Sequence, residues 1–382
     1  MNSVGLKAQL LTLGVKISPS SEAWFMPKPK SPERPQSLLI SVDKKVVAEC
    51  RFSETSPFSL IFGDSIEKTA VHHRDIVIEG IRPLEAPSWY WKTLEPVAPN
   101  VHVGDVFHIA GVDRLTIFPW DGCWFYHFDG LACAFCGAFC GTGHIRPRVL
   151  DLLKIKDYDI WWRTYGTRFL RAVDKSLEII LAEWKPEPHF HFMLTAGNLP
   201  NPNKAWQFAL ELSSVIQRHL DLAKVDSYLI LEPPKNFKYI GKAYEIGYQN
   251  IFFNLEFDKE SFDRFCKGKS IFFGYKRMLD ALNYALKIFG AVRTNFVLTE
   301  ELCNSTLKAC KDLGAQGVTP SATVFWPKPH SLWEKKSPPS ASTVEWFYKE
   351  LAKIYHQYNL TPAYCELSSR SSLENEAFRG WL

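Results

Sequence analysis

The sequence predicts an α/β fold, and three observations carry the prediction. From about residue 106, short runs rich in β-branched and aromatic residues alternate with longer amphipathic runs. The alternation repeats six times, which favours a parallel sheet covered by helices. At 382 residues, the chain is also long enough to bury a large core. Six such units fit a closed or partly open barrel better than a two-layer fold.

The expected strands and helices follow one another along the chain. The strands are Leu115–Pro119, His189–Leu194, Ser227–Leu231, Asn250–Glu256, Val292–Leu298 and Gly317–Phe325. The helices are Tyr158–Trp184, Lys204–Leu222, Phe237–Ile246, Tyr275–Phe289, Glu300–Leu313 and Ser342–Tyr358. In barrels of this kind, functional groups gather where the strands end.

Residues 1–105 have a different pattern, without alternation of strand and helix. Ser37–Val42 and Val46–Phe52 are β-like runs around a polar turn, which predicts a hairpin. Proline-rich segments at 27–35 and 83–87 interrupt the region. We therefore expect a β-containing N-terminal accessory domain over residues 1–105, the barrel over 106–335, and a C-terminal helix and tail over 336–382.

Composition narrows the possible partners and the compartment. The chain is 46% hydrophobic and 23% charged, and its formal charge of +4 comes from scattered basic residues. This charge does not imply nucleic acid or an anionic membrane as a partner. No run reaches the roughly 18 apolar residues of a membrane span, and no signal-peptide pattern is seen. Nine cysteines, an odd number, argue against a secreted disulfide framework and favour the cytoplasm.

Four of the nine cysteines fall between Gly122 and His144, in the most informative stretch of the chain. Its centre is Cys133-Ala134-Phe135-Cys136, set among glycines after the first strand of the barrel. Thiolates are soft ligands, and a glycine-rich backbone can wrap an iron–sulfur cluster. A catalytic [4Fe–4S] cluster needs three thiolates and leaves one iron open. Two sets of three are possible: Cys123, Cys133 and Cys136, or Cys133, Cys136 and Cys140.

Other chemistry can also use this loop. Zinc favours C-x2-C pairs, and Cys123 with His144 could complete a Cys₃His site, although a second C-x2-C pair is lacking. A non-catalytic electron-transfer protein could hold a cluster in the same loop. A metal-free hydrolase on this barrel lacks a convincing nucleophile and base in the sequence. The remaining cysteines share no spacing that predicts a second cluster; they include Cys266, Cys303, Cys310 and Cys365.

Together, the loop and the barrel resemble the radical S-adenosylmethionine (SAM) superfamily over about residues 106–335. The commonest family motif is C-x3-C-x-φ-C, with an aromatic φ near the adenine of SAM. Cys133–Cys136 matches its second half, so Phe135 takes the aromatic position. The next cysteine upstream, Cys123, is ten residues away instead of four. The resemblance implies a partial (βα)6 TIM-like barrel and a [4Fe–4S] cluster on Cys123, Cys133 and Cys136, with Cys140 as the alternative third ligand.

The resemblance also implies positions that bind SAM, and they share a place at or near the ends of strands. They are Gly197 and Asn198 after the second strand, Asn254 and Glu256 on the fourth, Arg277, and Glu301 after the fifth. Each has a plainer interpretation as a turn glycine, a satisfied polar group inside the barrel, or an ordinary helix residue. Glu232, at the end of the third strand, could face the mouth of the barrel and touch substrate.

The family chemistry defines the implied activity. The open iron would chelate SAM, and one electron would cleave SAM to methionine and a 5′-deoxyadenosyl radical. That radical would then abstract hydrogen from an unidentified substrate, in an oxidoreductase or transferase reaction. A low-potential electron donor of the flavodoxin or ferredoxin type is the implied partner.

Overall fold

The computed structural model describes residues 2–17, 37–42, 46–61, 70–73, 76–78, 82–83, 92, 94–110, 114–137, 145–184, 191–362 and 371–382. A seven-stranded sheet in chain order forms its centre. The strands are β10 (Phe107–Ala110), β11 (Arg114–Ile117), β12 (His191–Thr195), β13 (Asp226–Ile230), β14 (Asn250–Phe252), β15 (Val292–Leu298) and β16 (Val318–Val324). Strands β11 to β16 run parallel, and β10 pairs antiparallel with β11. All six predicted strands are present, whereas the antiparallel β10 was not predicted.

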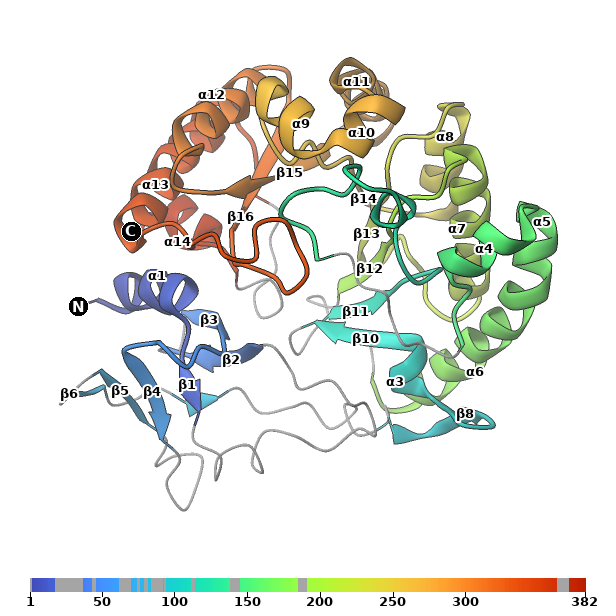
Figure 1. Ribbon diagram of the computed structural model, residues 1–382, viewed down its shortest axis with the longest axis horizontal. Helices are drawn as coiled ribbons and strands as arrows, with labels where there is room; N and C mark the ends of the chain where they lie inside the picture. Colours follow the sequence, from blue (N-terminus) through green and yellow to red (C-terminus); the bar gives the residue numbers. More distant parts are fainter. Residues whose placement is uncertain are drawn as a thin grey trace.

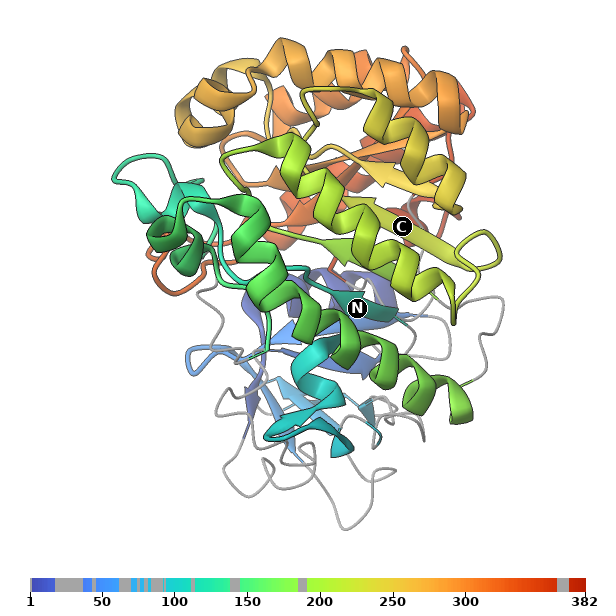
Figure 2. The same cartoon turned by 90° about the vertical axis from the view of Figure 1, so that its right-hand side faces the viewer.

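The helices surround the outer side of this curved sheet (Figure 1). They are α4 (Val149–Ile155), α5 (Tyr158–Trp161), α6 (Thr167–Glu183), α7 (Pro202–Gln217), α8 (Lys238–Ile246), α9 (Lys259–Phe265), α10 (Lys267–Phe272), α11 (Tyr275–Phe289), α12 (Cys303–Gly314), α13 (Ala341–Tyr358) and α14 (Glu374–Phe378). A π-helical turn, Trp162–Gly166, joins α5 to α6, so the predicted helix 158–184 is divided. Figure 2 views the side covered by the green helices.

Local sequence explains where the long helices begin and end. In α7, the side chain of Asn201 accepts hydrogen bonds from the first backbone N–H groups, and Pro202 occupies the first helical position. In α11, Met278, Ala281, Leu282 and Ala285 lie on one buried face. Gly290 ends α11 with a φ of 70°, a left-handed conformation that glycine adopts without strain.

The N-terminal part contains α1 (Ser3–Leu13) and small sheets. The predicted hairpin is present as β2 (Ser37–Ser41) and β3 (Val47–Arg51), with β7 (Arg82–Pro83) beside β2. A second sheet holds β1 (Lys16–Ile17), β4 (Phe58–Ile61), β5 (Ala70–His73) and β6 (Ile76–Ile78). The strands β8 (Pro96–Ala98) and β9 (Val101–His102) pair before the short helix α3 (Val103–Val106).

Helix α1 packs against both β3 and the C-terminal helix α13 (Figure 1). The ammonium of Lys7 on α1 contacts the carboxylate of Glu376 on α14 at 2.7 Å, and both side chains are only 1% exposed. The two ends of the described chain are therefore joined by a buried ion pair.

The inner face of the parallel sheet lines a cavity of about 210 Å³. Polar side chains from different strands face it, including Asn254, Asn295 and Thr323. The segment Ser371–Glu374 closes one side, because the Glu374 carboxylate accepts the backbone N–H of Ala322 at 2.7 Å. Among the helices of the described ranges, none combines the length and the apolar composition needed to cross a membrane.

Candidate functional site

The sequence-predicted residues gather where the parallel strands end. Cys123 follows β11, Gly197 follows β12, Glu232 follows β13, and Glu256 follows β14. Because all these strands run in the same direction, their carboxyl ends share one edge of the sheet. The topology therefore brings side chains that are far apart in sequence to one site.

The segment after β12 holds the beginning of the cysteine loop. The backbone N–H of Asn198 donates to the Cys123 sulfur at 3.3 Å, and the N–H of Trp124 donates to the Asn198 carbonyl at 2.8 Å. A Cβ atom on Gly197 would lie 2.4 Å from the carbonyl oxygen of Gly122. Only glycine fits this approach, so Gly197 and Asn198 lie directly against Cys123. Their predicted contacts with SAM stay predictions.

The insertion formed by α9 and α10 holds the other side of the loop. The N–H of Ala134 donates to the carbonyl of Phe265 at 2.8 Å, and the N–H of Gly268 donates to that of Leu131 at 3.0 Å. A Cβ atom on Gly268 would come within 2.4 Å of the Phe125 ring. The loop is thus fixed from two directions by backbone contacts that side chains larger than glycine would block.

Phe135 contributes an aromatic wall beside the cysteines. Its ring centroid lies 5.6 Å from that of Phe257 and 6.4 Å from that of Trp333. The N–H of Trp333 donates to the Ala134 carbonyl at 2.9 Å, so this aromatic group also anchors the loop. Phe135 is half-buried in this contact.

Cys123, Cys133 and Cys136 are free thiols with partly exposed side chains. Burial, together with the nearby Cys133 and Cys123 sulfurs, raises the pKa of Cys136 to about 12, while Lys328 acts in the opposite direction. Cys133 and Cys136 are joined by a tight turn, in which the N–H of Cys136 donates to the Cys133 carbonyl at 3.1 Å. Cys140 and His144, the alternative ligands, lie outside the described residues.

One compact group of possible ligand atoms occurs within the described ranges. Its three atoms, all within 4.8 Å of one another, belong to two carboxylates and a histidine, and none is a cysteine sulfur. The sulfurs of Cys123, Cys133 and Cys136 therefore do not all lie within 4.8 Å of one another.

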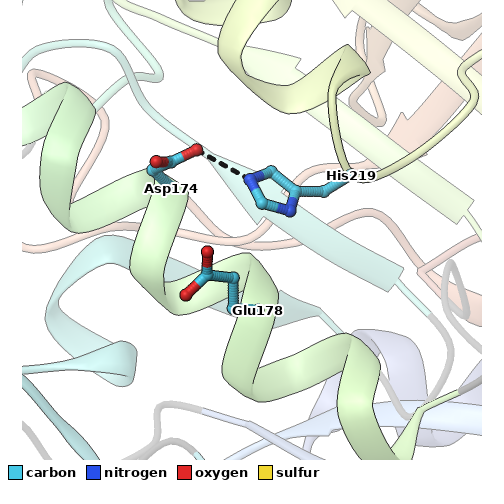
Figure 3. A group of neighbouring side chains, drawn as sticks. All are labelled: Asp174, Glu178 and His219. Carbon is cyan, nitrogen blue, oxygen red and sulfur yellow. Dashed lines mark hydrogen bonds and ion pairs between the residues drawn. The ribbon is translucent and has the colours of Figure 1, made fainter.

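That compact group, Asp174, Glu178 and His219, lies away from the cysteine loop, on α6 and just after α7 (Figure 3). One carboxylate oxygen of Asp174 contacts both the His219 ring at 2.7 Å and the guanidinium of Arg218 at 3.0 Å. The guanidinium of Arg218 therefore already pairs with this oxygen of Asp174. The group is therefore explained as an ion-pair network between two helices.

Next to the cysteines lies a buried cluster of three charges. The ammonium of Lys269 on α10 contacts Glu232 at 2.6 Å and Glu256 at 2.9 Å. The second carboxylate oxygen of Glu232 and the amide oxygen of Asn254 are buried without a hydrogen-bond partner. Burial raises the pKa of Glu232, although Lys269 opposes this effect. Unpartnered acceptors of this kind are uncommon in folded proteins.

Glu256 has an unusual backbone as well. Its φ is 67°, in the left-handed region that a residue with a Cβ rarely adopts. The strand β14 has ended, and Glu256 forms an isolated bridge with Phe296 instead. Strained positions of this kind cluster at functional sites.

Two predicted SAM-binding residues are engaged elsewhere. The guanidinium of Arg277 donates to the backbone carbonyls of Pro234 and Lys235, at 2.5 and 2.8 Å, and so holds the loop before α8. The carboxylate of Glu301 is 62% exposed and pairs with Lys336 at 2.8 Å. Neither residue joins the cluster of charges beside the cysteines in the described structure.

Sequence reasoning missed Lys269 and the position of Cys266. Both lie in or beside α10, which was not predicted, between the fourth strand and the helix α11. The available signal was weak, because Phe262–Phe273 mixes aromatic residues with four charged ones, and Lys267 and Lys269 cannot be told apart by pattern.

Comparison with known proteins adds the following. No family model matches the sequence, and no curated protein matches it. Among solved structures, the chain is similar to methylornithine synthase (PylB), with 13% identity, a TM-score of 0.43, and coverage of 67% of this chain and 64% of that one. It is also similar to coproporphyrinogen III oxidase (HemN) from Escherichia coli, a radical SAM enzyme, with 13% identity, a TM-score of 0.35, and coverage of 64% and 52%.

A third similar structure is HydG, a maturase of the [FeFe]-hydrogenase, with 12% identity, a TM-score of 0.39, and coverage of 67% of this chain and 52% of that one. The matched region thus spans between 52% and 64% of the length of these three proteins. The structural neighbours of the chain include a radical SAM enzyme.

Proposed function

We propose that the chain is a radical SAM enzyme that acts on an unidentified substrate. The observation that carries the proposal is the convergence of three free thiols from one glycine-rich loop at the carboxyl edge of six parallel strands. The proposed ligands of a [4Fe–4S] cluster are Cys123, Cys133 and Cys136. Three thiolates leave one iron of the cluster open for SAM.

The residues of the site fit these two cofactors on two grounds. The donor set consists of thiols, which iron–sulfur clusters use. Buried acceptors without partners, on Glu232 and Asn254, are available for the donor groups of a bound molecule.

Cys123, Cys133 and Cys136 would hold the cluster, and a bound cluster would supply the electron for reductive cleavage of SAM. The protein supplies position and surroundings. Asn198 donates to the Cys123 sulfur and so orients the first ligand. Lys269 balances the charge of Glu232 and Glu256 beside the cysteines. Phe135, within its aromatic wall, restricts water on one side of the loop.

The predicted SAM contacts remain part of the proposal, with different support for each. Gly197, Asn198, Asn254 and Glu256 lie at the edge where the cysteines lie, which supports a role for them. For Arg277 and Glu301, a role requires that they exchange the partners described above. The free oxygen of Glu232 makes this residue a further candidate for contact with SAM or substrate.

The test is anaerobic reconstitution with iron and sulfide, followed by dithionite and SAM, with 5′-deoxyadenosine measured by mass spectrometry. We expect 5′-deoxyadenosine from the wild type and none from Cys136→Ala. Cys303→Ala is the matched control, since Cys303 is a partly exposed cysteine on α12, outside the loop. A Cys136→Ala protein with full iron and full SAM cleavage would refute the proposal.

The alternative is a non-catalytic iron–sulfur or zinc-binding protein that uses the same loop. It predicts a loaded metal site without SAM binding and without 5′-deoxyadenosine. Metal analysis of the loaded protein distinguishes zinc from iron, and titration with SAM separates an electron carrier from an enzyme that awaits its substrate.

The broader assignment follows from the same proposal. The curved parallel sheet is taken as a partial (βα)6 TIM-like barrel over residues 106–335, with residues 1–105 as an accessory domain and 336–382 as C-terminal helix and tail. A flavodoxin-type or ferredoxin-type donor would supply the electron, and the cytoplasm would supply the reducing conditions. Whether the enzyme is an oxidoreductase or a transferase depends on its substrate.

A further inference from the structure

The cavity on the inner face of the sheet is lined by a cationic and an acidic side chain that come from opposite edges. Arg114 on β11 and Glu374 on α14 both line it. Strands β11 and β16 are the two edges of the parallel part of the sheet. Glu374 is joined to β16, because its carboxylate accepts the Ser321 hydroxyl at 3.0 Å and the backbone N–H of Ala322 at 2.7 Å. The guanidinium and the carboxylate therefore approach one cavity from opposite edges of the sheet.

On the strands between these edges, the lining includes apolar side chains. They are Met193 on β12, Ile230 on β13 and Phe252 on β14. The cavity volume of about 210 Å³ lies below the ~300–1,000 Å³ of pockets for drug-sized ligands. The lining thus suits a short aliphatic chain that carries a charged group at each end.

Within the described residues, the carboxylate of Glu374 is buried without a cation paired to it. The residue is 5% exposed. The guanidinium of Arg293 acts on it at longer range, but donates to Asn250 at 3.0 Å and to the carbonyl of Thr361 at 3.4 Å. Each carboxylate oxygen of Glu374 accepts one hydrogen bond and has a lone pair for another. A buried carboxylate of this kind is stabilised when a cation reaches it.

The surroundings of Glu374 agree with this need for a cation. Burial, above all, raises the pKa of Glu374 to about 7, and the nearby carboxylate of Glu376 acts in the same direction. Glu376 is itself paired with Lys7 on α1 at 2.7 Å. The other titratable groups that act with Glu374 are kept neutral because burial raises their pKa values, and they are Cys310 on α12 and Tyr348 and Tyr355 on α13.

We propose that this cavity binds a small aliphatic zwitterion as the substrate, with its ammonium group on Glu374 and its carboxylate on Arg114. The identification of this molecule as the substrate rests on the proposed function, whereas its binding does not.

Asn254 connects the cavity with the proposed site. It lines the cavity, and its amide oxygen is buried without a hydrogen-bond partner in the described structure. It also lies at the carboxyl edge of the sheet, where the cysteines lie. The aliphatic part of a molecule in the cavity would therefore be next to the proposed contacts with SAM.

The test is isothermal titration calorimetry of the full chain with three zwitterions of increasing length, namely β-alanine, γ-aminobutyrate and ε-aminocaproate. The comparison probes are the amine and the carboxylic acid of the same chain length, such as butylamine and butyrate. We expect at least one zwitterion to bind at least about tenfold more tightly than its amine and its acid, because each of these lacks one charged group. Binding by none of the three zwitterions would overturn the proposal, as would equal affinity for the matched amine or acid.

Variants assign the two ends of the molecule. Glu374→Gln keeps the size of the side chain and a hydrogen-bond acceptor but removes the charge, and Arg114→Gln removes the cation. Each should weaken binding of the zwitterion at least about tenfold. Glu350→Gln on α13 is the matched control, since its carboxylate pairs with Lys353 and does not line the cavity. Wild-type affinity in Glu374→Gln would contradict the assignment of the ammonium.

Release of protons gives a readout that a purely structural role of Glu374 would not change. At pH 7 about half of the Glu374 carboxyls carry a proton, and an ammonium group bound beside them favours the ionised form. Titrations in two buffers of different ionisation enthalpy should therefore show about 0.5 proton released to the buffer for each molecule bound. Wild-type binding without release of protons would refute contact with Glu374, even if Glu374→Gln failed to fold.

The outcomes for this inference and for the proposed function can be separated. A zwitterion bound through Glu374 and Arg114, in a chain that forms no 5′-deoxyadenosine, would support the cavity as a binding site and count against the radical SAM activity. The reverse result, SAM cleavage by a chain that binds none of the three zwitterions, would overturn only the inference about the substrate.

Discussion

The polar side chains at the two ends of the sheet's inner face differ in how completely they are hydrogen-bonded. Near the amino ends of the strands, Asp226 accepts hydrogen bonds from the Tyr228 hydroxyl and from Asn250 at 2.8 Å, and it contacts His191 at 2.8 Å. Asn250 in turn accepts from Arg293 at 3.0 Å. This end is a closed network that joins four neighbouring strands.

The carboxyl end is an open network by comparison. Lys269 donates to Glu232, to Glu256 and to the backbone carbonyl of Asn254, but the second carboxylate oxygen of Glu232 and the side-chain amide oxygen of Asn254 have no donor. Burying a polar group without a partner costs free energy, so such atoms persist where something else is gained. The difference teaches that the amino end satisfies its polar groups within the sheet, whereas the carboxyl end keeps buried acceptors that are available to the proposed ligand.

The largest expected effect is the loss of bound iron when Cys123, a proposed cluster ligand at the carboxyl end of the sheet, is replaced. Cys123→Ala should lower the bound iron at least tenfold, because it removes one of three ligands, while Cys140→Ala should leave it unchanged. Iron analysis and absorbance after reconstitution measure both. The opposite pattern would transfer the third ligand position to Cys140.

Removal of the Lys269 ammonium should lower the folding stability of the chain, although Lys269 is not one of the proposed cluster ligands. Lys269→Met leaves two buried carboxylates without their partner, and breaking a buried ion pair in this way costs about 3–5 kcal/mol. Urea denaturation of the metal-free chain measures the change. Lys276→Met is the matched control, since its ion pair with Asp280 is exposed and should contribute under about 1 kcal/mol. Equal effects from both variants would contradict the difference in burial.

A smaller effect is expected from filling the gap between β12 and the cysteine loop. In Gly197→Ala the new Cβ meets the Gly122 carbonyl, so the loop must shift, at about 1–3 kcal/mol. The bound iron should also fall. Gly241→Ala on α8 has open space for its Cβ and should stabilise the chain by about 1 kcal/mol. Thermal unfolding of both variants checks the contrast, and unaltered unfolding in Gly197→Ala would refute the close approach.

The smallest expected effect is a difference between the two ends of the sheet in how their contribution to folding stability depends on pH. Burial opposes ionisation of Asp226, but hydrogen bonds from His191 and Tyr228 dominate and lower the pKa of its carboxyl. Its contribution to stability is therefore lost as the pH falls through the lowered pKa. Burial raises the pKa of Glu232 above 4.5, so its contribution is present at low pH and is lost as the pH rises through the raised pKa.

Variants of the two residues should consequently respond to pH in opposite ways. In the metal-free chain, Asp226→Asn should reduce the loss of stability on acidification, and Glu232→Gln should reduce the loss on the alkaline side. Urea denaturation over a series of pH values measures both. The same direction of change in the two variants would remove the proposed distinction.

The sequence was sufficient to predict the regular part of the fold. The six strands and the long helices carry hydrophobic patterns over many residues, so the positions of β15 and α11 agree closely with prediction. The hairpin of β2 and β3 was predicted from the same kind of pattern. The cysteine motif also stood out, because its spacing is local and does not depend on tertiary contacts.

The remainder of the site depends on contacts between distant segments. Helices α9 and α10 have seven and six residues, too few for a clear period, and the backbone hydrogen bonds that join the cysteine loop to them follow from docking of the loop. Arg277 and Glu301 were chosen by resemblance alone. Local carbonyls and a neighbouring lysine satisfy them in the structure, and no pattern in the sequence distinguishes these partners from SAM.

The ion pair between Lys7 and Glu376 has a consequence for biosynthesis. Its partners are 369 residues apart in sequence, so the ribosome adds those residues after Lys7 before Glu376 is made. During that interval the ammonium of Lys7 stays in water, because burial without its partner costs free energy. Helix α1 can therefore make its buried contact with α14 only after Glu376 has been synthesised.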